Sequence, residues 1–372
     1  MRGKLMLRKF IFIIKLSLFP ALAWPLSKDV TRLKKICVQL YHYLGIILAI
    51  SVQVSLVHNI VNHFDDVVLL VVLILFLSGV THSLANFIFH RIYSQRIQYV
   101  TFEMIHFSES IQPHEDVIIK QYIDRFIVVY GMDVLSLYVS TLLAVIAVPF
   151  LMDQPFPMPI EYPFNVYNQP LRTIIYLYHS VVGIHVAAQT STNILMGLLL
   201  WVISARLEIL ANELRKTTDI YHLVKCIKKH QYLLKCATEI SFAVRPFAFT
   251  TICCSTIVTI IVLLFLSTDN LTMIYQYTGL IIRTLTEIFM YTWPAESLIE
   301  TSQDVAETVF QMPWYNQSIK IRKILQIIIQ RSRKPITISI PCVMSALSLN
   351  YFTSYFSTIV SYFKMLRMFL ND

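Results

Sequence analysis

The sequence is poor in charge and in glycine. Only 14% of its 372 residues are charged and only 7 are glycine, whereas 56% are hydrophobic. An ordinary soluble domain carries roughly 25% charged residues, so this chain lacks the polar surface that keeps such a domain in water. The mean hydropathy is +0.61 over the whole length. This composition indicates a protein with several membrane spans and excludes a cytosolic enzyme of average composition.

Motifs for catalysis and nucleotide binding are also missing. The sequence has no HExxH, Walker A loop, GxGxxG, GxSxG or paired CxxC, so nothing calls for catalysis, a cofactor or a metal. Its six cysteines lie in apolar or basic segments, which argues against a disulfide-stapled extracellular domain. The net charge is +9, but the basic residues lie between apolar runs. We interpret them as signals of membrane topology and expect no nucleic-acid partner.

Seven apolar runs are long enough to cross a bilayer, which needs roughly 20 residues per helix. They cover residues 37–57, 66–89, 126–150, 173–202, 240–267, 273–293 and 337–363. Lys and Arg concentrate before the first run and in every second connection, whereas residues 58–65 and 268–272 have none. By the positive-inside rule the N-terminus is cytoplasmic and the C-terminus extracellular. The predicted fold is therefore an all-α membrane protein with seven transmembrane helices.

The chain divides into four predicted parts. Residues 1–36 form a cytoplasmic N-terminal segment, and 37–302 contain the first six spans. Residues 303–335 form a cytoplasmic anchor loop and helix, and 336–372 form the last helix with a short extracellular end. Residues 1–24 could pass for a secretory signal. Because Lys15 interrupts their apolar stretch, we favour an uncleaved helix on the inner leaflet.

Three ionisable residues lie inside predicted spans, where charge is costly and often functional. Asp133 lies in the third span, and Arg283 and Glu287 are one turn apart in the sixth. We expect the latter two to neutralise each other as an i, i+4 pair facing the bundle. A direct role in ligand or ion binding is the alternative.

The last span carries a stripe of small polar residues that ends in methionine. At 100° per residue, its six members fall within an arc of about 80°. The opposite side carries Phe352, Phe356, Ile359, Phe363 and Leu366. Such a stripe either packs helices together or lines a water-filled path closed by an apolar constriction. The stripe consists of Asn350, Ser354, Ser357, Ser361, Met365 and Met368.

The C-terminal third contains a series of short motifs in a fixed order: Tyr291–Leu298, Ser302, Trp314–Tyr315, Arg331–Pro335 and Ser361–Phe363. In order and spacing they resemble the signature of insect odorant receptors. The family usually has Cys where Thr292 stands and Gly where Ala295 stands. The length, the span count and the inverted topology also fit the family.

The resemblance implies an odorant-gated, non-selective cation channel in the plasma membrane of sensory dendrites. It also implies a tetramer in which a ligand-tuning subunit such as this one associates with a shared co-receptor. In the family the last helix splits at the membrane face, and the constriction maps to Met365 and Phe369. A chemoreceptor of the G-protein-coupled type, a gustatory-receptor-like channel and a transporter are the alternatives. Of these, the G-protein-coupled class is disfavoured by the predicted topology.

The family also implies where a small volatile odorant binds. The pocket lies in the outer half of the bundle, between the second, third, fourth and sixth spans, and is expected to be mostly apolar. The candidate residues are Tyr138, Thr141, Leu142, Tyr178, Val182, Tyr277, Thr278 and Ile281.

The basic segment before Pro335 carries an apolar side formed by Ile321, Ile324, Leu325 and Ile328. Because that side cannot stay exposed to the cytosol, we expect it to pack against other subunits. Contact with anionic membrane lipid is the alternative.

Overall fold

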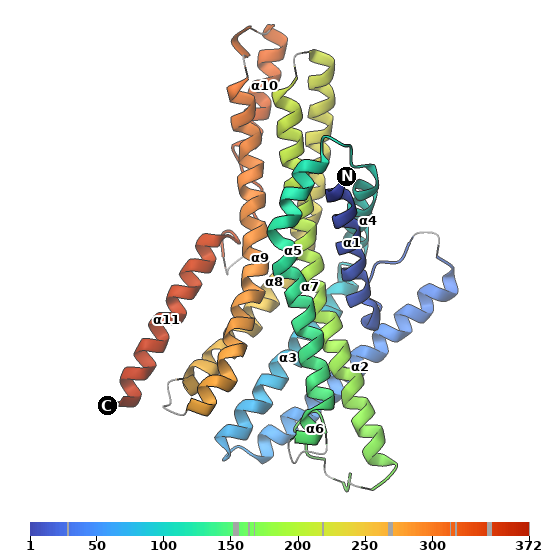
Figure 1. The fold of residues 1–372 in the computed structure, drawn as a ribbon, viewed down its shortest axis with the longest axis vertical. Coiled ribbons are helices and arrows are strands. Elements are labelled where there is room, and N and C mark those ends of the chain that lie inside the picture. The colour runs from blue at the N-terminus through green and yellow to red at the C-terminus, as the bar shows by residue number, and fades with distance from the viewer. Residues whose placement is uncertain are drawn as a thin grey trace.

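A computed structural model describes most of the chain: residues 1–27, 30–151, 156–162, 164–166, 168–217, 219–266, 271–312, 314–316, 318–340 and 344–371. The described part is almost entirely helical, which confirms the predicted fold class (Figure 1). Its only β-structure is an isolated bridge between Ile340 and Met344. The helices are α1 (Arg2–Ser17), η1 (Phe19–Ala21), α2 (Arg32–Asn62), α3 (Val67–Ile92), α4 (Ser94–Ser110), α5 (Asp116–Ile146), α6 (Val148–Leu151), α7 (Leu171–Arg215), α8 (Ile220–Leu266), α9 (Leu271–Gln311), η2 (Trp314–Asn316), α10 (Ile319–Ser332) and α11 (Leu349–Asn371).

Five helical segments within the described residues are long and apolar enough to cross a membrane. They correspond to the first five predicted spans, and α9 and α11 contain the sixth and the seventh. The helices α7, α8 and α9 have 45, 47 and 41 residues, about twice what a bilayer requires. Their surplus length forms a stalk with α10 at one end of the molecule, at the top of Figure 1.

The last span begins later than predicted. The sequence placed it at 337–363, but α11 starts at Leu349. Pro335 disfavours helix before it, and the β-branched residues that follow it favour an extended chain. Tertiary contacts hold that conformation, because Ser302 Oγ accepts from the Ile336 amide at 3.1 Å and the Leu347 amide donates to the Ile338 carbonyl at 2.8 Å.

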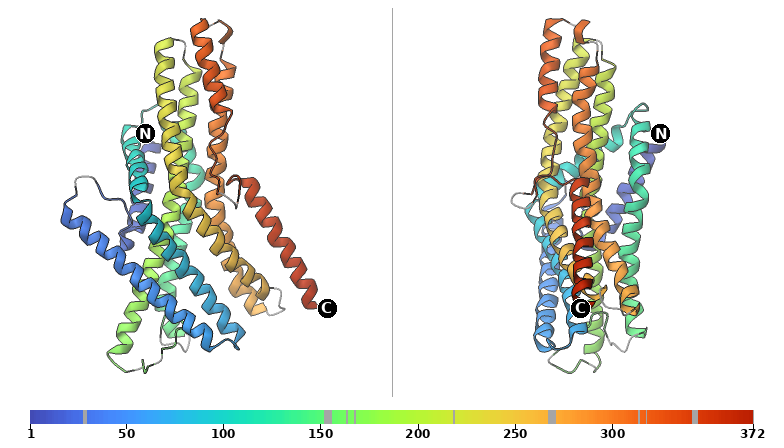
Figure 2. Two further views of the ribbon diagram at one scale, coloured as in Figure 1. Left: turned by 180° about the vertical axis from the view of Figure 1, so that it is seen from behind. Right: turned by 90° about the vertical axis from the view of Figure 1, so that its left-hand side faces the viewer.

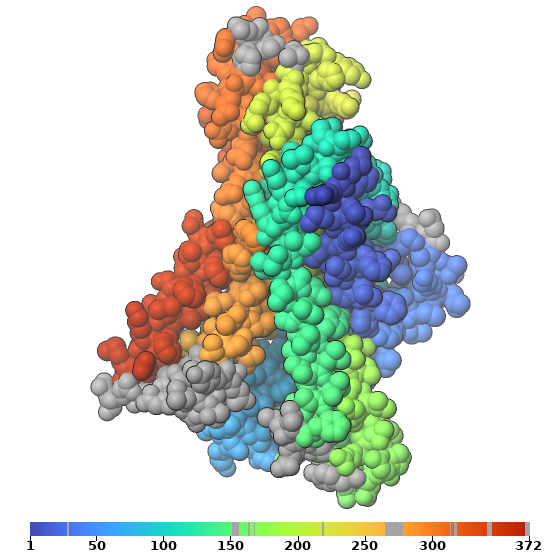
Figure 3. Space-filling model, in the orientation of Figure 1, coloured from blue at the N-terminus to red at the C-terminus, as the bar shows by residue number. Residues whose placement is uncertain are grey.

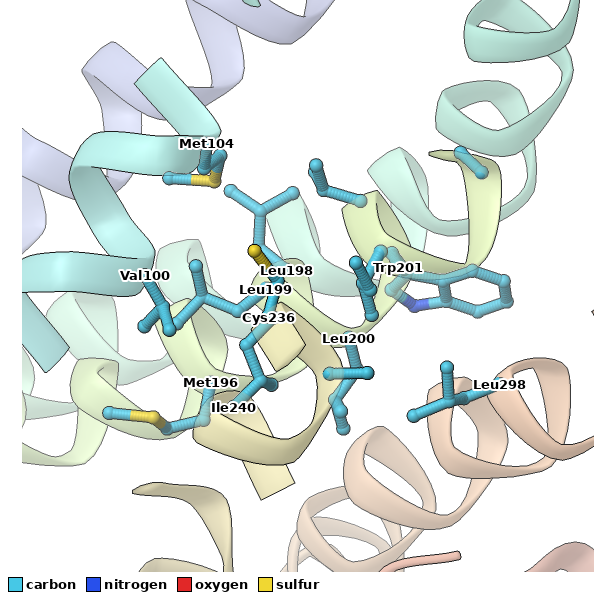
Figure 4. Packing of buried hydrophobic residues seen from close by; sticks show 14 of the residues in the cluster. Val100, Met104, Met196, Leu198, Leu199, Leu200, Trp201, Cys236, Ile240 and Leu298 are labelled. Atoms are coloured by element: carbon cyan, nitrogen blue, oxygen red, sulfur yellow. The ribbon is translucent and has the colours of Figure 1, made fainter. Parts of the chain in front are cut away.

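The centre of the bundle is α7, in which every residue from 187 to 205 is buried. A helix that is buried all round needs neighbours on all sides, and α5, α8, α9 and α3 supply them. Gly197 allows the closest approach, since a Cβ there would lie 2.4 Å from the Tyr130 hydroxyl. Figure 4 shows Trp201 of α7 and Leu298 of α9 on one side of this packing, and Cys236 and Ile240 of α8 on the other side near Val100.

The N-terminal helix α1 lies along α5 on the surface of the bundle (Figure 3). Its buried face contains Leu7, Phe10 and Ile14. The Gly3 and Lys4 amides donate to the Asp116 carboxylate at 3.3 and 2.8 Å. These contacts tie the segment to the start of α5, and the position of its other face on the inner leaflet stays a prediction.

Candidate functional site

Four helices meet at a buried polar cluster in the middle of the bundle. His82 of α3 lies 3.1 Å from the hydroxyl of Thr251 in α8, measured from Nε2 to Oγ1. Asn193 of α7 donates to the same hydroxyl at 3.3 Å and accepts from the Tyr291 hydroxyl of α9 at 2.9 Å. All four side chains are buried. Because a buried polar group is costly without a partner, this cluster fixes how α3, α7, α8 and α9 pack.

A charged cluster on α9 has hydrogen-bond partners on α5 and α8. Arg283 donates to Glu287 Oε1 from Nε at 3.0 Å and from Nη2 at 2.7 Å, which confirms the predicted i, i+4 pair. Arg283 also donates to Asp133 of α5, and Ser255 of α8 donates to Glu287 at 3.3 Å. Sequence reasoning singled out all three charged residues but did not join Asp133 to the pair. Only the packing of α5 against α9 brings it there.

The candidate pocket residues of α5 point in different directions. Tyr138 donates from its hydroxyl to the Ser17 carbonyl, beside α1. Thr141 faces α7, since its Cγ2 atom would lie 3.6 Å from a Cβ added at Gly183. Leu142 is 50% exposed on the surface of the single chain. Of the three, Tyr138 and Thr141 are half-buried and Leu142 is exposed.

The candidates of α7 pack toward α2 and α3. Tyr178 donates to the Leu48 carbonyl at 3.3 Å and lies 2.5 Å from the Ser51 hydroxyl, measured between oxygens. Val182 is buried in an apolar cluster with Leu73 and Val80.

On α9, Ile281 is half-buried and Thr278 is exposed. The side chain of Tyr277 lies outside the described residues. The structure thus groups Tyr178 and Val182 on one side of α7, while Thr141 approaches α7 from α5.

All six residues of the polar stripe on α11 are exposed on the single chain, and the side chain of Phe369 lies outside the described residues. The opposite side is attached to the bundle. The ring of Phe352 contacts that of Phe289 with centroids 5.4 Å apart, and the Tyr355 hydroxyl lies 3.1 Å from that of Thr256. Phe356 departs from the expected pattern, because it is 47% exposed. Figure 2 shows α11 leaning away from the other helices.

The family-like motif residues on α9 hold the chain that leads into α11. Glu296 accepts a hydrogen bond from the Leu349 amide at 2.9 Å, at the start of α11. Trp293 stacks on Phe289 at 5.1 Å and meets the edge of Trp201 at 5.0 Å, both between ring centroids. In the sequence these residues indicate only membership of a family. Their structural role depends on contacts with segments distant in sequence.

The apolar side of α10 is covered within the chain, which corrects the argument that it must pack against other subunits. Leu325 and Ile328 are 2% and 5% exposed and belong to the main apolar core. Helix α9 packs against α10 because the chain reverses direction at η2. The side left uncovered contains Ile319 and Ile327, each 66% exposed.

An acidic cavity of about 440 Å³ lies between α7 and α9, beyond the end of the sixth predicted span. Burial raises the pKa of Asp304, and the nearby Glu307 and Glu208 carboxylates raise it further. Burial likewise raises the pKa of Glu300. Arg125 and Arg215 also line the cavity and offset part of this charge.

A separate group of possible metal ligands consists of His114, Glu115 and Glu213. The Lys229 ammonium lies 2.6 Å from Glu213 and 3.8 Å from Glu115. This lysine already supplies the positive charge that the carboxylates need.

Together, these features define a class: a polytopic membrane protein with a polar bundle core and a last helix that presents a polar stripe away from its own chain. The family model described as 7tm Odorant receptor matches residues 66–360. The chain belongs to the seven-transmembrane odorant receptor family.

Two curated relatives agree with this assignment. Odorant receptor 22c of Drosophila melanogaster is 34% identical over 117 residues, which is 32% of this chain and 27% of that protein. Odorant receptor 10 of Aedes albopictus is 26% identical over 157 residues, covering 42% and 41% of the two chains. The matched parts thus span about a quarter and about two fifths of these relatives.

Solved structures resemble the whole fold. The insect olfactory receptor OR5 from Machilis hrabei superimposes with a TM-score of 0.82 and 17% identity, covering 98% of each chain. The same receptor in complex with eugenol superimposes with a TM-score of 0.79 and 18% identity, again covering 98% of each chain. At this identity the likeness establishes a common fold.

Proposed function

We propose that this protein is an odorant receptor that works as a subunit of an odorant-gated, non-selective cation channel in the plasma membrane. Its family membership and its fold, shared with an olfactory receptor that binds eugenol, support this function. In the proposed orientation the N-terminus is cytoplasmic and the C-terminus extracellular. The stalk of α7–α10 then lies in the cytoplasm.

The exposed polar stripe of α11 is the observation that carries the channel function. Ser354, Ser357 and Ser361 are all exposed on one side of α11, and hydrocarbon solvates hydroxyl groups poorly, so this side suits water better than lipid. Water in a pore formed by several chains solvates them, and they can replace part of an ion's hydration shell. Met365, and Phe369 one turn further out, would then narrow the pore.

The odorant pocket is proposed in the outer half of the bundle, around Thr141, Val182 and Ile281. An apolar site with a few polar groups suits a small volatile molecule. Arg283, which holds the charged cluster together, follows Ile281 closely in α9. A movement of α9 on ligand binding would therefore displace this cluster. Ring contacts then connect α9 to α11, because Phe289 packs against both Trp293 of α9 and Phe352 of α11.

A shared co-receptor is the proposed partner, and exposed Ile319 and Ile327 of α10 are the proposed contact in the cytoplasmic stalk. This surface replaces the covered side of α10 that the sequence suggested.

Expression in cells that lack odorant receptors tests the function. With the co-receptor, a panel of volatile odorants should evoke cation currents that the co-receptor alone does not give. An extracellular tag after Asp372 should stain without permeabilisation. A response that requires a G protein, or a tag that stains only after permeabilisation, would support the G-protein-coupled alternative.

A further inference from the structure

A polar cavity of about 180 Å³ lies between the N-terminal segment, the first half of α2 and the junction of α3 with α4. The walls are fixed by hydrogen bonds to backbone carbonyls. Tyr41 donates to the Pro20 carbonyl at 2.5 Å, and His42 Nε2 donates to the Leu22 carbonyl at 3.1 Å. Gln98 of α4 donates to the Leu26 carbonyl at 2.5 Å. The first half of α2 diverges from α3 here, as Figure 2 shows in its left view.

The charge of this cavity is positive. Lys35 of α2 and Arg91 of α3 line it, and its described lining contains no carboxylate. Neither Lys35 nor Arg91 forms an ion pair with a described acidic residue. The two cations therefore face the cavity without compensation within the described part of the chain.

A buried imidazole lies beside the two cations. His90 is 8% exposed and lines the cavity, and its ring packs against that of His42 with centroids 5.9 Å apart. An oxygen-rich anion in the cavity would supply a counter-charge for Lys35 and Arg91.

The surroundings distinguish a lipid from a soluble anion. In the proposed orientation, the start of α2 and the end of α3 lie at the cytoplasmic membrane face, where phospholipid headgroups lie. The same two helices expose Leu33, Leu40, Ile88 and Ile92, each at least 41% exposed. Basic pockets between membrane helices on this side suit anionic headgroups, and the exposed apolar residues suit acyl chains.

We propose that this cavity binds the phosphate headgroup of an anionic phospholipid of the inner leaflet. Lys35 and Arg91 contact the phosphate from opposite walls. The bound lipid adds a bridge between α2 and the junction of α3 with α4, beside the direct contact of the His42 and His90 rings. The proposal rests on the proposed membrane orientation, and its cavity shares no lining residue with the proposed odorant pocket.

Lipid capture by the purified full-length protein tests the site. The protein is placed in nanodiscs of phosphatidylcholine containing photoactivatable phosphatidylserine, and crosslinked peptides are quantified. A basic residue near an anionic lipid surface contributes about 1 kcal/mol, so Lys35→Gln and Arg91→Gln should each reduce capture about fivefold. Lys35→Arg should retain it. Lys34→Gln is the matched control, because Lys34 is exposed and does not line the cavity.

Three outcomes would overturn the proposal. An equal loss in Lys34→Gln would indicate general attraction to the surface. Equal capture of a photoactivatable phosphatidylcholine would remove the requirement for an anionic headgroup. Loss of capture on adding inorganic phosphate, with phosphate binding retained in lipid-free micelles, would make the site one for a free anion. Thermal unfolding of each variant separates loss of binding from loss of folding.

Discussion

Arg283 of α9 donates a hydrogen bond to Asp133 of α5, from which it is separated by 150 residues. The same guanidinium binds Glu287, so one cation is shared by two carboxylates from different helices. Charges inside a membrane bundle are tolerated when they are paired and face the interior. The cluster therefore sets one cation against two carboxylates, and it joins α5 to α9.

Replacing Asp133 by Asn should destabilise the bundle. Removing one partner of a buried pair typically costs about 3–5 kcal/mol, and the loss should be about 2 kcal/mol here because Glu287 still binds Arg283. Thermal unfolding in detergent micelles measures it. A double-mutant cycle that combines Asp133→Asn with Arg283→Gln should give a coupling free energy of about 1 kcal/mol or more, since contacting residues couple in this range. Additive losses would mean that the two residues do not interact.

Replacing Glu296 by Ala should loosen the first turn of α11. Its carboxylate accepts from the Leu349 amide, and loss of such a cap costs about 1 kcal/mol. Hydrogen exchange of the amides at 349–351 should then quicken about fivefold. Glu300→Ala is the control, because Glu300 lies one turn further along α9 and lines the acidic cavity, whereas the Leu349 amide donates to Glu296. Similar exchange in both variants would rule out the cap.

Substitutions at two adjacent isoleucines of α10 should distinguish an effect on folding from an effect on assembly. Ile328 is 5% exposed and Ile327 is 66% exposed. Ile328→Asp buries a charge in the core and should destabilise the chain by more than about 4 kcal/mol. Ile327→Asp should change stability by less than about 0.5 kcal/mol yet reduce co-purification with the co-receptor. Undiminished co-purification of the Ile327 variant would exclude that side of α10 from the interface.

Replacing Met365 by Ser should raise the basal current of the channel. An apolar ring excludes ions by making water unstable in a narrow path, and a small polar residue lets the path wet. Whole-cell leak and relative cation permeability are recorded beside Phe363→Ser, whose side chain is on the half-buried side of α11. An effect of the Phe363 variant alone would show that the stripe does not face the pore.

The sequence alone determined the class of fold and the family. Seven apolar runs of sufficient length and the alternation of basic connections are local properties, because each helix in a bilayer must satisfy its own backbone hydrogen bonds. The stripe on the last span could also be found from helical periodicity, and the structure leaves that whole stripe exposed on the chain. The break after α10 followed from Pro335, whose effect on the preceding residue is local.

Only the tertiary structure decided which distant residues meet. The late start of α11 depends on Ser302 holding Ile336 in an extended segment, and the pairing of Asp133 with Arg283 depends on how α5 packs against α9. The apolar side of α10 looked like an interface because its sequence does not reveal that α9 covers it. Periodicity specifies which side of a helix is apolar, but the free energy of packing the whole chain determines what buries that side.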